Sequence, residues 1–199
     1  MIDPSTDAEL LARARRGDED AFRALVVRYE PVVAATVIGM LGRGADADDV
    51  GQETFIRFYD ALDRFREEST LKTYLVRIAM NLSLNALQRR RRGALRFVSR
   101  DDTDVSLAEP AVEPAAMDDA DERRAVVRRA IARLAPKHQA VVVLRMLQSL
   151  STRDTATALG VPEGTVLSRL SRAMKELQAT LAPYMRDGAL TGGRIDEPR

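Results

Sequence analysis

Apolar side chains recur along this chain at the three- and four-residue spacing of an α-helix rather than in the alternation of a β-strand. Between residues 46 and 62 the expected core side of one helix is formed by Val50, Thr54, Phe55, Phe58, Ala61 and Leu62. The opposite side carries Asp49, Gln52, Glu53 and Asp60. Ile56 lies in the middle of this polar side, where it is either a stray exposed residue or the apolar centre of a protein-docking surface.

A charged loop, residues 63–69, follows this helix, and its only apolar side chain is Phe65. Because the neighbours of Phe65 are charged, we expect its ring to lie outside the core, where it either covers the core or stacks on an unpaired base. Ser69 or Thr70 is expected to cap the next helix. The buried stripe of that helix consists of Leu71, Leu75, Ile78, Leu82 and Ala86.

A polar row runs beside the buried stripe and consists of Tyr74, Arg77, Asn81 and Gln88. The helix ends in a run of arginines at positions 89–92. These side chains offer stacking, phosphate contacts and hydrogen bonds to base edges. The row is therefore either a surface that reads nucleic acid or a polar face that is only solvated.

The residues before position 46 show the same helical pattern. Thr6 and Glu9 form a capping-box pair, Gly17 favours a helix end, and Asp18 can cap the following helix. After Pro31 an apolar run over 32–41 is either a buried continuation or a separate helix. It is about half as long as a bilayer-spanning helix, and the N-terminus lacks a signal-peptide pattern. We therefore expect one all-α domain over residues 1–92, in a soluble cytoplasmic protein with no membrane insertion.

The composition changes sharply after residue 92. Carboxylates dominate residues 93–121, where Pro110 and Pro114 also lie, and this composition predicts a flexible acidic linker. Apolar stripes return after position 122 and predict a second small helical domain over residues 122–185. Glycine and charged residues in the segment 186–199 predict a disordered tail.

The second domain contains a helix-turn-helix pattern. Ser151 is a predicted helix cap, Ala156 is small enough for close helix packing, and Gly160 suits a left-handed turn. In the following helix the core side is formed by Val166, Leu170, Ala173, Leu177 and Leu181. The outer side presents Thr165, Ser168, Arg169, Ser171, Arg172 and Lys175. Hydroxyl and cationic groups on one face suit a DNA major groove, although a helical hairpin with solvated charges has the same pattern.

Composition narrows the possible functions. The 199 residues include no cysteine and one histidine, His138, which exclude a disulfide framework, a thiolate metal site and an imidazole cluster. We therefore expect neither an enzyme of the metal or triad type nor a bound cofactor. The net charge of +1 does not argue against nucleic-acid binding, because the 31 basic and 30 acidic residues are segregated along the chain.

Residues 48–65, DDVGQETFIRFYDALDRF, and residues 69–92, STLKTYLVRIAMNLSLNALQRRRR, together resemble region two of bacterial sigma factors of the sigma-70 family, in the extracytoplasmic-function group. Residues 159–177, LGVPEGTVLSRLSRAMKEL, resemble region four of the same family. The family pattern is not matched at Gly51, Tyr74, Met80, Thr155 and Leu167. The family usually has an aliphatic residue, a tryptophan, a basic residue, an aliphatic residue and a basic residue at these positions, respectively.

The resemblance implies a role for each candidate site. The first helix would dock on the clamp helices of the large subunit of core RNA polymerase through Asp49, Gln52, Glu53 and Phe55, beside Ile56. The minus-ten promoter element would be read as melted single strand through Phe65, Tyr74, Arg77 and Asn81. The minus-thirty-five element would be read as duplex through Ser168, Arg169, Ser171 and Arg172, flanked by Thr165 and Lys175. An anti-sigma factor is a further expected partner.

The sequence thus predicts a sigma factor with two small helical domains that gives RNA polymerase its promoter specificity. One alternative is a stand-alone helix-turn-helix regulator that binds duplex DNA unaided. Another is an interaction module whose acidic helix binds a different protein. A duplex-only regulator has no need of a loop aromatic, Phe65, beside a face that reads single strands. Such a regulator also usually carries a sensor or dimerisation domain, and neither is visible in this sequence.

Overall fold

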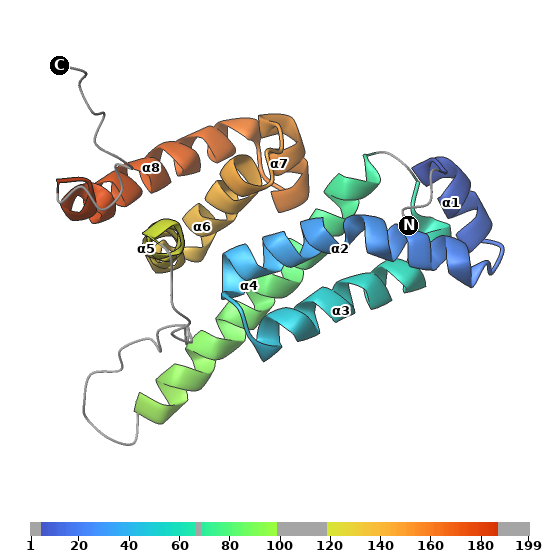
Figure 1. Cartoon of the computed structure of the whole chain (residues 1–199), viewed down its shortest axis with the longest axis horizontal. Helices are drawn as coiled ribbons and strands as arrows, with labels where there is room; N and C mark the ends of the chain where they lie inside the picture. The colour runs from blue at the N-terminus through green and yellow to red at the C-terminus, as the bar shows by residue number, and fades with distance from the viewer. Residues whose placement is uncertain (1–4, 67–68, 99–118, 187–199) are drawn as a thin grey trace, which may run out of the picture.

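The computed structural model describes residues 5–66, 69–98 and 119–186, and every regular element in these ranges is helical (Figure 1). The order along the chain is α1 (Asp7–Ala14), α2 (Glu19–Leu41), α3 (Ala45–Asp60), η1 (Leu62–Arg64), α4 (Leu71–Val98), α5 (Asp119–Arg133), α6 (Pro136–Val142), η2 (Val143–Leu147), α7 (Thr152–Leu159) and α8 (Glu163–Arg186). The predicted all-α class with two small helical domains is confirmed.

The helix ends form where the sequence predicts them. Thr6 and Glu9 make both bonds of a capping box, and the Ser151 hydroxyl accepts from the Asp154 N–H at 3.0 Å. Thr70 rather than Ser69 caps α4, because the Thr70 hydroxyl accepts from the Thr73 N–H at 3.2 Å. These bonds satisfy N–H groups that have no partner inside the helix.

Asp18 caps α2 through its side chain, which accepts from the Ala21 N–H at 3.1 Å. This bond and a second one from the Arg13 guanidinium lower the pKa of Asp18 below its usual value. The helix then continues unbroken through Pro31 to Leu41, so the apolar run after the proline is a continuation and not a separate helix. A helix of 23 residues results.

Within the described residues, α2 alone has the length and apolar composition that would allow a helix to cross a membrane. The central helix of a helical bundle has the same two properties. Here α2 contacts α1, α3 and α4, and Leu25, Val33 and Val37 are at most 1% exposed. These three apolar side chains therefore pack against protein, whereas Val27 on the same helix is 52% exposed.

Helix α4 is buried along two faces over its first four turns, and its C-terminal end extends beyond the other helices (Figure 1). It contacts α2 and α3 of the first domain and also α6 and α7 of the second. Leu71, Leu75 and Leu82 form the stripe expected from the sequence. A second buried row contains Val76, Met80 and Ser83, all 0% exposed. Lys72 precedes Val76 by one turn on this second row, and its Nζ donates to Gln148 O at 3.0 Å, so the row faces the second domain.

The end of α2 is completed by residues from distant parts of the chain. The last carbonyl groups of a helix lack partners within it. Gly42 N–H bonds the Ile38 carbonyl at 2.9 Å, and Arg90 bonds the Leu41 carbonyl at 3.3 Å. The side-chain amide of Gln139, in α6, donates to the Gly39 and Met40 carbonyls at 2.9 and 3.1 Å. The second domain therefore caps a helix of the first.

Gly39 also permits the two domains to approach closely. A Cβ atom at this position would lie 3.0 and 3.1 Å from the two methyl groups of Val143 in η2. Val143 is 0% exposed. Buried residues of both domains consequently belong to one continuous hydrophobic core.

The described helices extend into the stretch that the sequence assigns to a linker. Helix α4 runs to Val98, and α5 begins at Asp119, so both helices pass the expected linker limits of residues 93 and 121. The central part of that stretch, residues 99–118, and the predicted tail from residue 187 onward lie outside the described residues.

Replacing Gly39 with leucine should destabilise the chain, whereas the same replacement at Gly51 should not. Both positions lie inside helices, where leucine has a higher helix propensity than glycine by roughly 0.5–1 kcal/mol. At Gly39 the new side chain must displace Val143, and overpacking of this kind costs about 1–3 kcal/mol. At Gly51 no atom lies within 4 Å of the added Cβ. Urea unfolding measures both variants, and equal midpoints would contradict the packing described for Gly39.

Candidate polymerase and nucleic-acid interfaces

The outer face of α3 brings together most of the predicted docking residues. Ala47, Val50, Thr54 and Phe58 are buried and fix which side of the helix faces the core. Asp49, Gln52 and Ile56 are exposed on the other side, and Ile56 is 56% exposed. The exposed face thus combines a carboxylate, an amide and an apolar side chain at helical spacing.

Glu53 and Phe55 flank this face rather than form it. Glu53 is half-buried and accepts from Arg57 Nε at 2.8 Å, one turn further along α3. Phe55 is partly buried and packs against the hydrophobic core. Tyr59, which the sequence analysis did not select, is 56% exposed and lies three residues after Ile56. That spacing is the signal that identifies it as a neighbour of Ile56 on the outer face.

The polar row of α4 remains exposed where the helix is not buried against either domain. Arg77, Asn81 and Gln88 are exposed, and Asn85, which the sequence analysis did not select, continues the row between them. Tyr74 is half-buried, and the Arg77 guanidinium lies 5.3 Å from the centre of its ring. This cation–π contact holds Arg77 in place at the start of the row.

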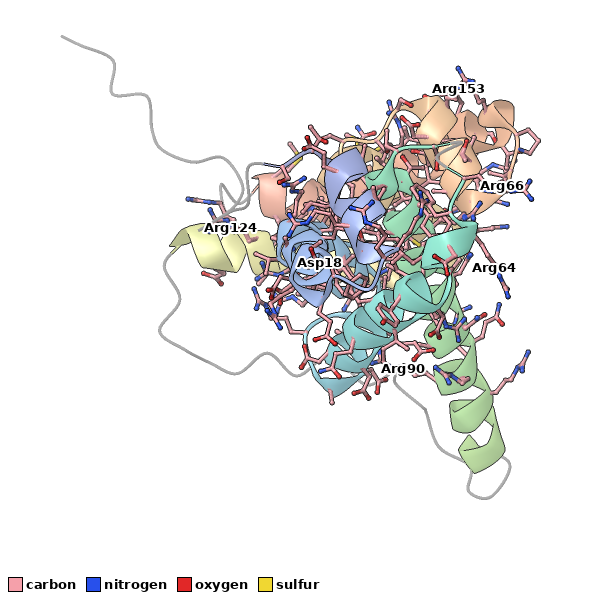
Figure 2. The ribbon with its side chains drawn as sticks, turned by 90° about the vertical axis from the view of Figure 1, so that its right-hand side faces the viewer. Asp18, Arg64, Arg66, Arg90, Arg124 and Arg153 are labelled. Carbon is pink, nitrogen blue, oxygen red and sulfur yellow. The ribbon has the colours of Figure 1, made fainter. Side chains whose placement is uncertain are left out.

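The prediction that Phe65 lies outside the core is wrong in this structure. Its side chain is only 6% exposed, and its ring centre lies 4.7 Å from that of Tyr74. The backbone at Phe65 is extended, so neighbouring side chains point in opposite directions. Figure 2 shows Arg64 and Arg66 extending outward. The burial of Phe65 between them means that its ring packs inward.

Arg15 of the first domain fixes this inward position. Its guanidinium donates to the Leu62 carbonyl at 3.2 Å and to the Phe65 carbonyl at 2.6 Å. These contacts join residues that are 47 and 50 positions apart, so helix periodicity gives no sign of them. A base-stacking role for Phe65 would require its ring to leave the core.

One of the arginines at the end of the polar row has a structural role. Arg90 forms an ion pair with Asp46 of α3 at 2.6 Å and also bonds the Leu41 carbonyl (Figure 2). All four arginines of the run are exposed, but the charge of Arg90 is paired with Asp46. The cationic surface expected from the run is therefore formed mainly by Arg89, Arg91 and Arg92.

The helix-turn-helix has the predicted geometry. Gly160 ends α7 in the left-handed conformation, with φ 63° and ψ 37°. Val141, Ala156 and Val166 form a small core between the helices. On α8, Ser168, Ser171, Arg172 and Lys175 are exposed, whereas Thr165 and Arg169 are half-buried at the edge of the same face. The hydroxyl and cationic side chains expected on one face are thus together.

His138 helps to hold α8 in place. Its Nδ1 lies 2.8 Å from Glu176 Oε1 on α8, one turn after Arg172. The imidazole is 7% exposed, whereas the Glu176 side chain is 47% exposed, so the contact lies at the boundary between the core and the surface. The contact joins α6 to α8 across the second domain.

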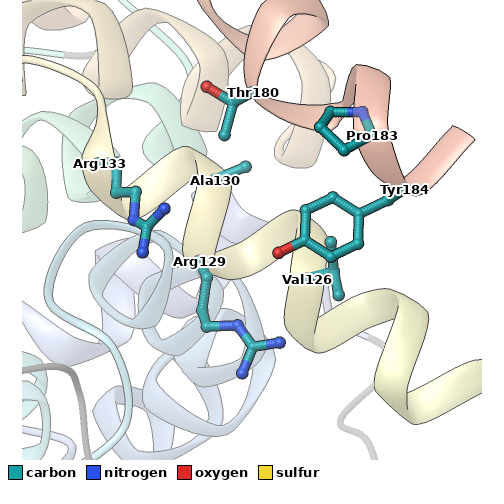
Figure 3. A pocket seen from close by; sticks show the side chains of 7 residues that line it. All are labelled: Val126, Arg129, Ala130, Arg133, Thr180, Pro183 and Tyr184. Carbon is teal, nitrogen blue, oxygen red and sulfur yellow. The ribbon is translucent and has the colours of Figure 1, made fainter.

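A pocket of about 280 Å³ lies between α5 and the end of α8 (Figure 3). Val126 and Ala130 form its apolar wall, and Tyr184 lies opposite. The guanidinium groups of Arg129 and Arg133 border it. The pocket lies outside the outer face of α3 and the polar row of α4.

The structure thus defines a class of protein in which one helical domain carries an exposed mixed face on α3 and a polar row on α4, and a second domain carries a helix-turn-helix. Comparison with known proteins agrees with this class. The model of Sigma-70 region 2 matches residues 25–93, and the model of Sigma-70 region 4 matches residues 124–177.

Full-length relatives give the same result. The chain is 33% identical over 192 residues to the RNA polymerase sigma-H factor of Pseudomonas aeruginosa, covering 94% of this chain and 100% of that protein. It is 35% identical over 195 residues to the ECF RNA polymerase sigma-E factor of Escherichia coli K12, with the same coverage. The solved structure of CnrH in complex with the cytosolic domain of CnrY is similar, with a TM-score of 0.65, 27% identity and coverage of 90% of this chain and 99% of that one.

The chain belongs to the sigma-70 family of RNA polymerase sigma factors, in the extracytoplasmic-function (ECF) group. It is a sigma factor, which directs RNA polymerase to promoters. The predicted family and function are confirmed, and the stand-alone regulator is not favoured. Sigma factors are generally non-catalytic, DNA-binding initiation factors.

Phe65→Ala should lower the free energy of unfolding by about 3 kcal/mol, because it removes a buried aromatic ring from the core. The control is Arg66→Ala at the adjacent exposed position, where we expect a change of no more than about 0.5 kcal/mol. Urea unfolding measures both. An equally small effect at Phe65 would show that its ring is exposed in solution.

Proposed function

We propose that α3 is the surface through which this sigma factor binds core RNA polymerase, at the clamp helices of the large subunit. Asp49, Gln52 and Ile56 form the exposed part of the surface, with Glu53 at its edge and Phe55 supporting it from the core side. An apolar side chain surrounded by polar groups is the usual arrangement at the centre of a protein interface. Tyr59 extends the apolar part of the surface.

We further propose that the polar row of α4 binds the minus-ten element as single-stranded DNA. Asn81, Asn85 and Gln88 are exposed amides, which can both donate to and accept from base edges. Arg77 lies at the start of the row, where it can contact phosphate, and Arg89, Arg91 and Arg92 extend the positive charge beyond it. Tyr74 would contribute indirectly, because its ring holds the Arg77 guanidinium in position through the cation–π contact.

The second domain would bind the minus-thirty-five element as duplex, with α8 in the major groove. The side chains that reach the DNA are Thr165, Ser168, Arg169, Ser171, Arg172 and Lys175. We assign base contacts to Arg172 and the serines, and a phosphate contact to Lys175. The residues 1–92 and 122–185 are thus the two functional units.

The observation that carries this proposal is the exposure of the α4 polar row in a chain that also has a helix-turn-helix. A duplex-binding regulator uses the second feature alone. We assign no catalytic residue and no cofactor, since initiation by a sigma factor needs binding and not bond making. The proposed site of action is the cytoplasm, where RNA polymerase works.

We also propose an anti-sigma factor as a partner. The support is the similarity to CnrH, whose solved structure contains the cytosolic domain of CnrY. Such a partner would hold the chain away from core polymerase until it is released.

Ile56→Glu should weaken binding to core RNA polymerase at least about tenfold, because it places a charge at the apolar centre of the docking surface. Met146→Glu is the matched control, since Met146 is also 56% exposed but lies on η2 of the second domain. A pull-down titration with core polymerase measures both. Equal affinities for the two variants would remove Ile56 from the interface.

Replacing Asn81 and Asn85 together with alanine should reduce promoter opening about tenfold or more while core binding is retained. Unstacking a base costs a few kcal/mol, and contacts with the unpaired strand must offset this cost. Permanganate reactivity of unpaired thymines on a cognate promoter measures opening. Gln178→Ala, which removes an exposed amide from α8, is the control.

A template with a pre-melted bubble distinguishes melting from other defects. The double variant should recover most of its run-off transcription on this template, because the bases are already unpaired and no free energy is needed to open the duplex. Normal permanganate reactivity on fully paired DNA would contradict the proposed role of the α4 polar row.

A further inference from the structure

Leu167 is an exposed apolar residue within the DNA-facing side of the recognition helix. Its side chain is 55% exposed, although the adjacent Val166 is 0% exposed in the small core of the helix-turn-helix. Leu167 and Ser171 are four residues apart and therefore lie on the same side of α8. Ser168, next to Leu167, is exposed as well. The outer face of α8 thus begins with a branched apolar side chain rather than a cation.

The position of Leu167 along the helix favours a contact with bases. Recognition helices approach base edges with their N-terminal residues, and Leu167 lies in the second turn of α8, which starts at Glu163. Gly164, one turn earlier on this side, is exposed, and no atom lies within 4 Å of a Cβ built on it. The start of the helix therefore presents little bulk that would keep Leu167 from the groove floor.

The chemistry of the major groove offers one matching group. Bases present hydrogen-bond donors and acceptors there, and the C5 methyl group of thymine is the apolar exception. Hydroxyl and guanidinium groups on the same face bind the polar edges, but a leucine cannot. We propose that Leu167 selects thymine at one position of the upstream duplex element by packing against its C5 methyl group, an inference that rests on the proposed role of α8.

A protein partner for Leu167 is less consistent with its surroundings. The other exposed apolar residues at the end of α8, Tyr184 and Met185, lie about 25 Å further along the helix. Met174 is 43% exposed and about 10 Å away. Between Leu167 and these residues the exposed face carries Ser171, Arg172 and Lys175, so Leu167 does not join a continuous apolar patch.

The test uses the full chain bound to core RNA polymerase and a promoter duplex selected from a library randomised over the upstream element. Each thymine of the selected element is then replaced, one at a time, by deoxyuridine, which lacks only the methyl group. Burial of one methyl group corresponds to about a three- to fourfold change in affinity. We expect that loss at one thymine for the unmodified chain, and no loss there for Leu167→Ala.

Met174→Ala is the matched control and should keep the sensitivity to deoxyuridine, because its side chain lies outside the N-terminal turns of α8. Leu167→Arg should lose the sensitivity to deoxyuridine. It should also make the slope of log affinity against log salt concentration more negative by about 1, as one added phosphate contact would. Equal sensitivity of the unmodified chain and Leu167→Ala, or no sensitive thymine at all, would overturn the inference.

The Arg172→Ala variant shows whether a negative result concerns Leu167 alone or the reading of duplex DNA by α8 as a whole. If Arg172→Ala abolishes the selected sequence preference while no thymine is methyl-sensitive, α8 reads the element and only the role of Leu167 is wrong. If Arg172→Ala leaves the preference unchanged, or if no sequence is selected, the reading of duplex DNA by α8 and the inference for Leu167 both fail.

Discussion

The burial of α4 along two faces is the constraint on which the rest of the structure depends. One face completes the core with α2 and α3, and the other, with Val76 and Met80, meets the second domain. Between Leu71 and Leu87 only a narrow strip of the helix remains exposed, and it carries Arg77, Asn81 and Asn85. Stability and nucleic-acid binding therefore occupy different angular positions on the same helix, so that changes in one need not disturb the other.

The contact between the domains combines favourable packing with buried polar atoms that lack hydrogen-bond partners. Gln139 caps the end of α2, and Val143 packs at Gly39. Buried polar atoms without a hydrogen-bond partner nevertheless occur in or next to the elements that form the contact: His138 Nε2, Arg145 Nε, Gln148 Nε2 and Thr155 Oγ1. Each such atom costs about 1–3 kcal/mol. The net stabilisation of the contact is therefore smaller than its apolar packing alone would give.

Sequence reasoning succeeded where the relevant contacts are local. The caps at Thr6, Asp18 and Ser151 and the turn at Gly160 follow from residues at most a few positions apart. It failed for Phe65, because the Arg15 contacts that hold this loop join residues 47 and 50 positions apart. It also missed the second buried face of α4, since the contacts of that face with the second domain are distant in sequence: the bond from Lys72 to the Gln148 carbonyl joins residues 76 positions apart.

Departures from the family pattern have different consequences according to their exposure. Met80 and Thr155 are both 0% exposed, and they lie on α4 and α7, which contact one another. Their side chains therefore bear on how the two domains pack, not on which DNA the protein reads. Leu167 is 55% exposed and can change recognition without any cost to the core. Burial thus separates the substitutions that adjust stability from those that adjust specificity, and the family pattern alone does not make that distinction.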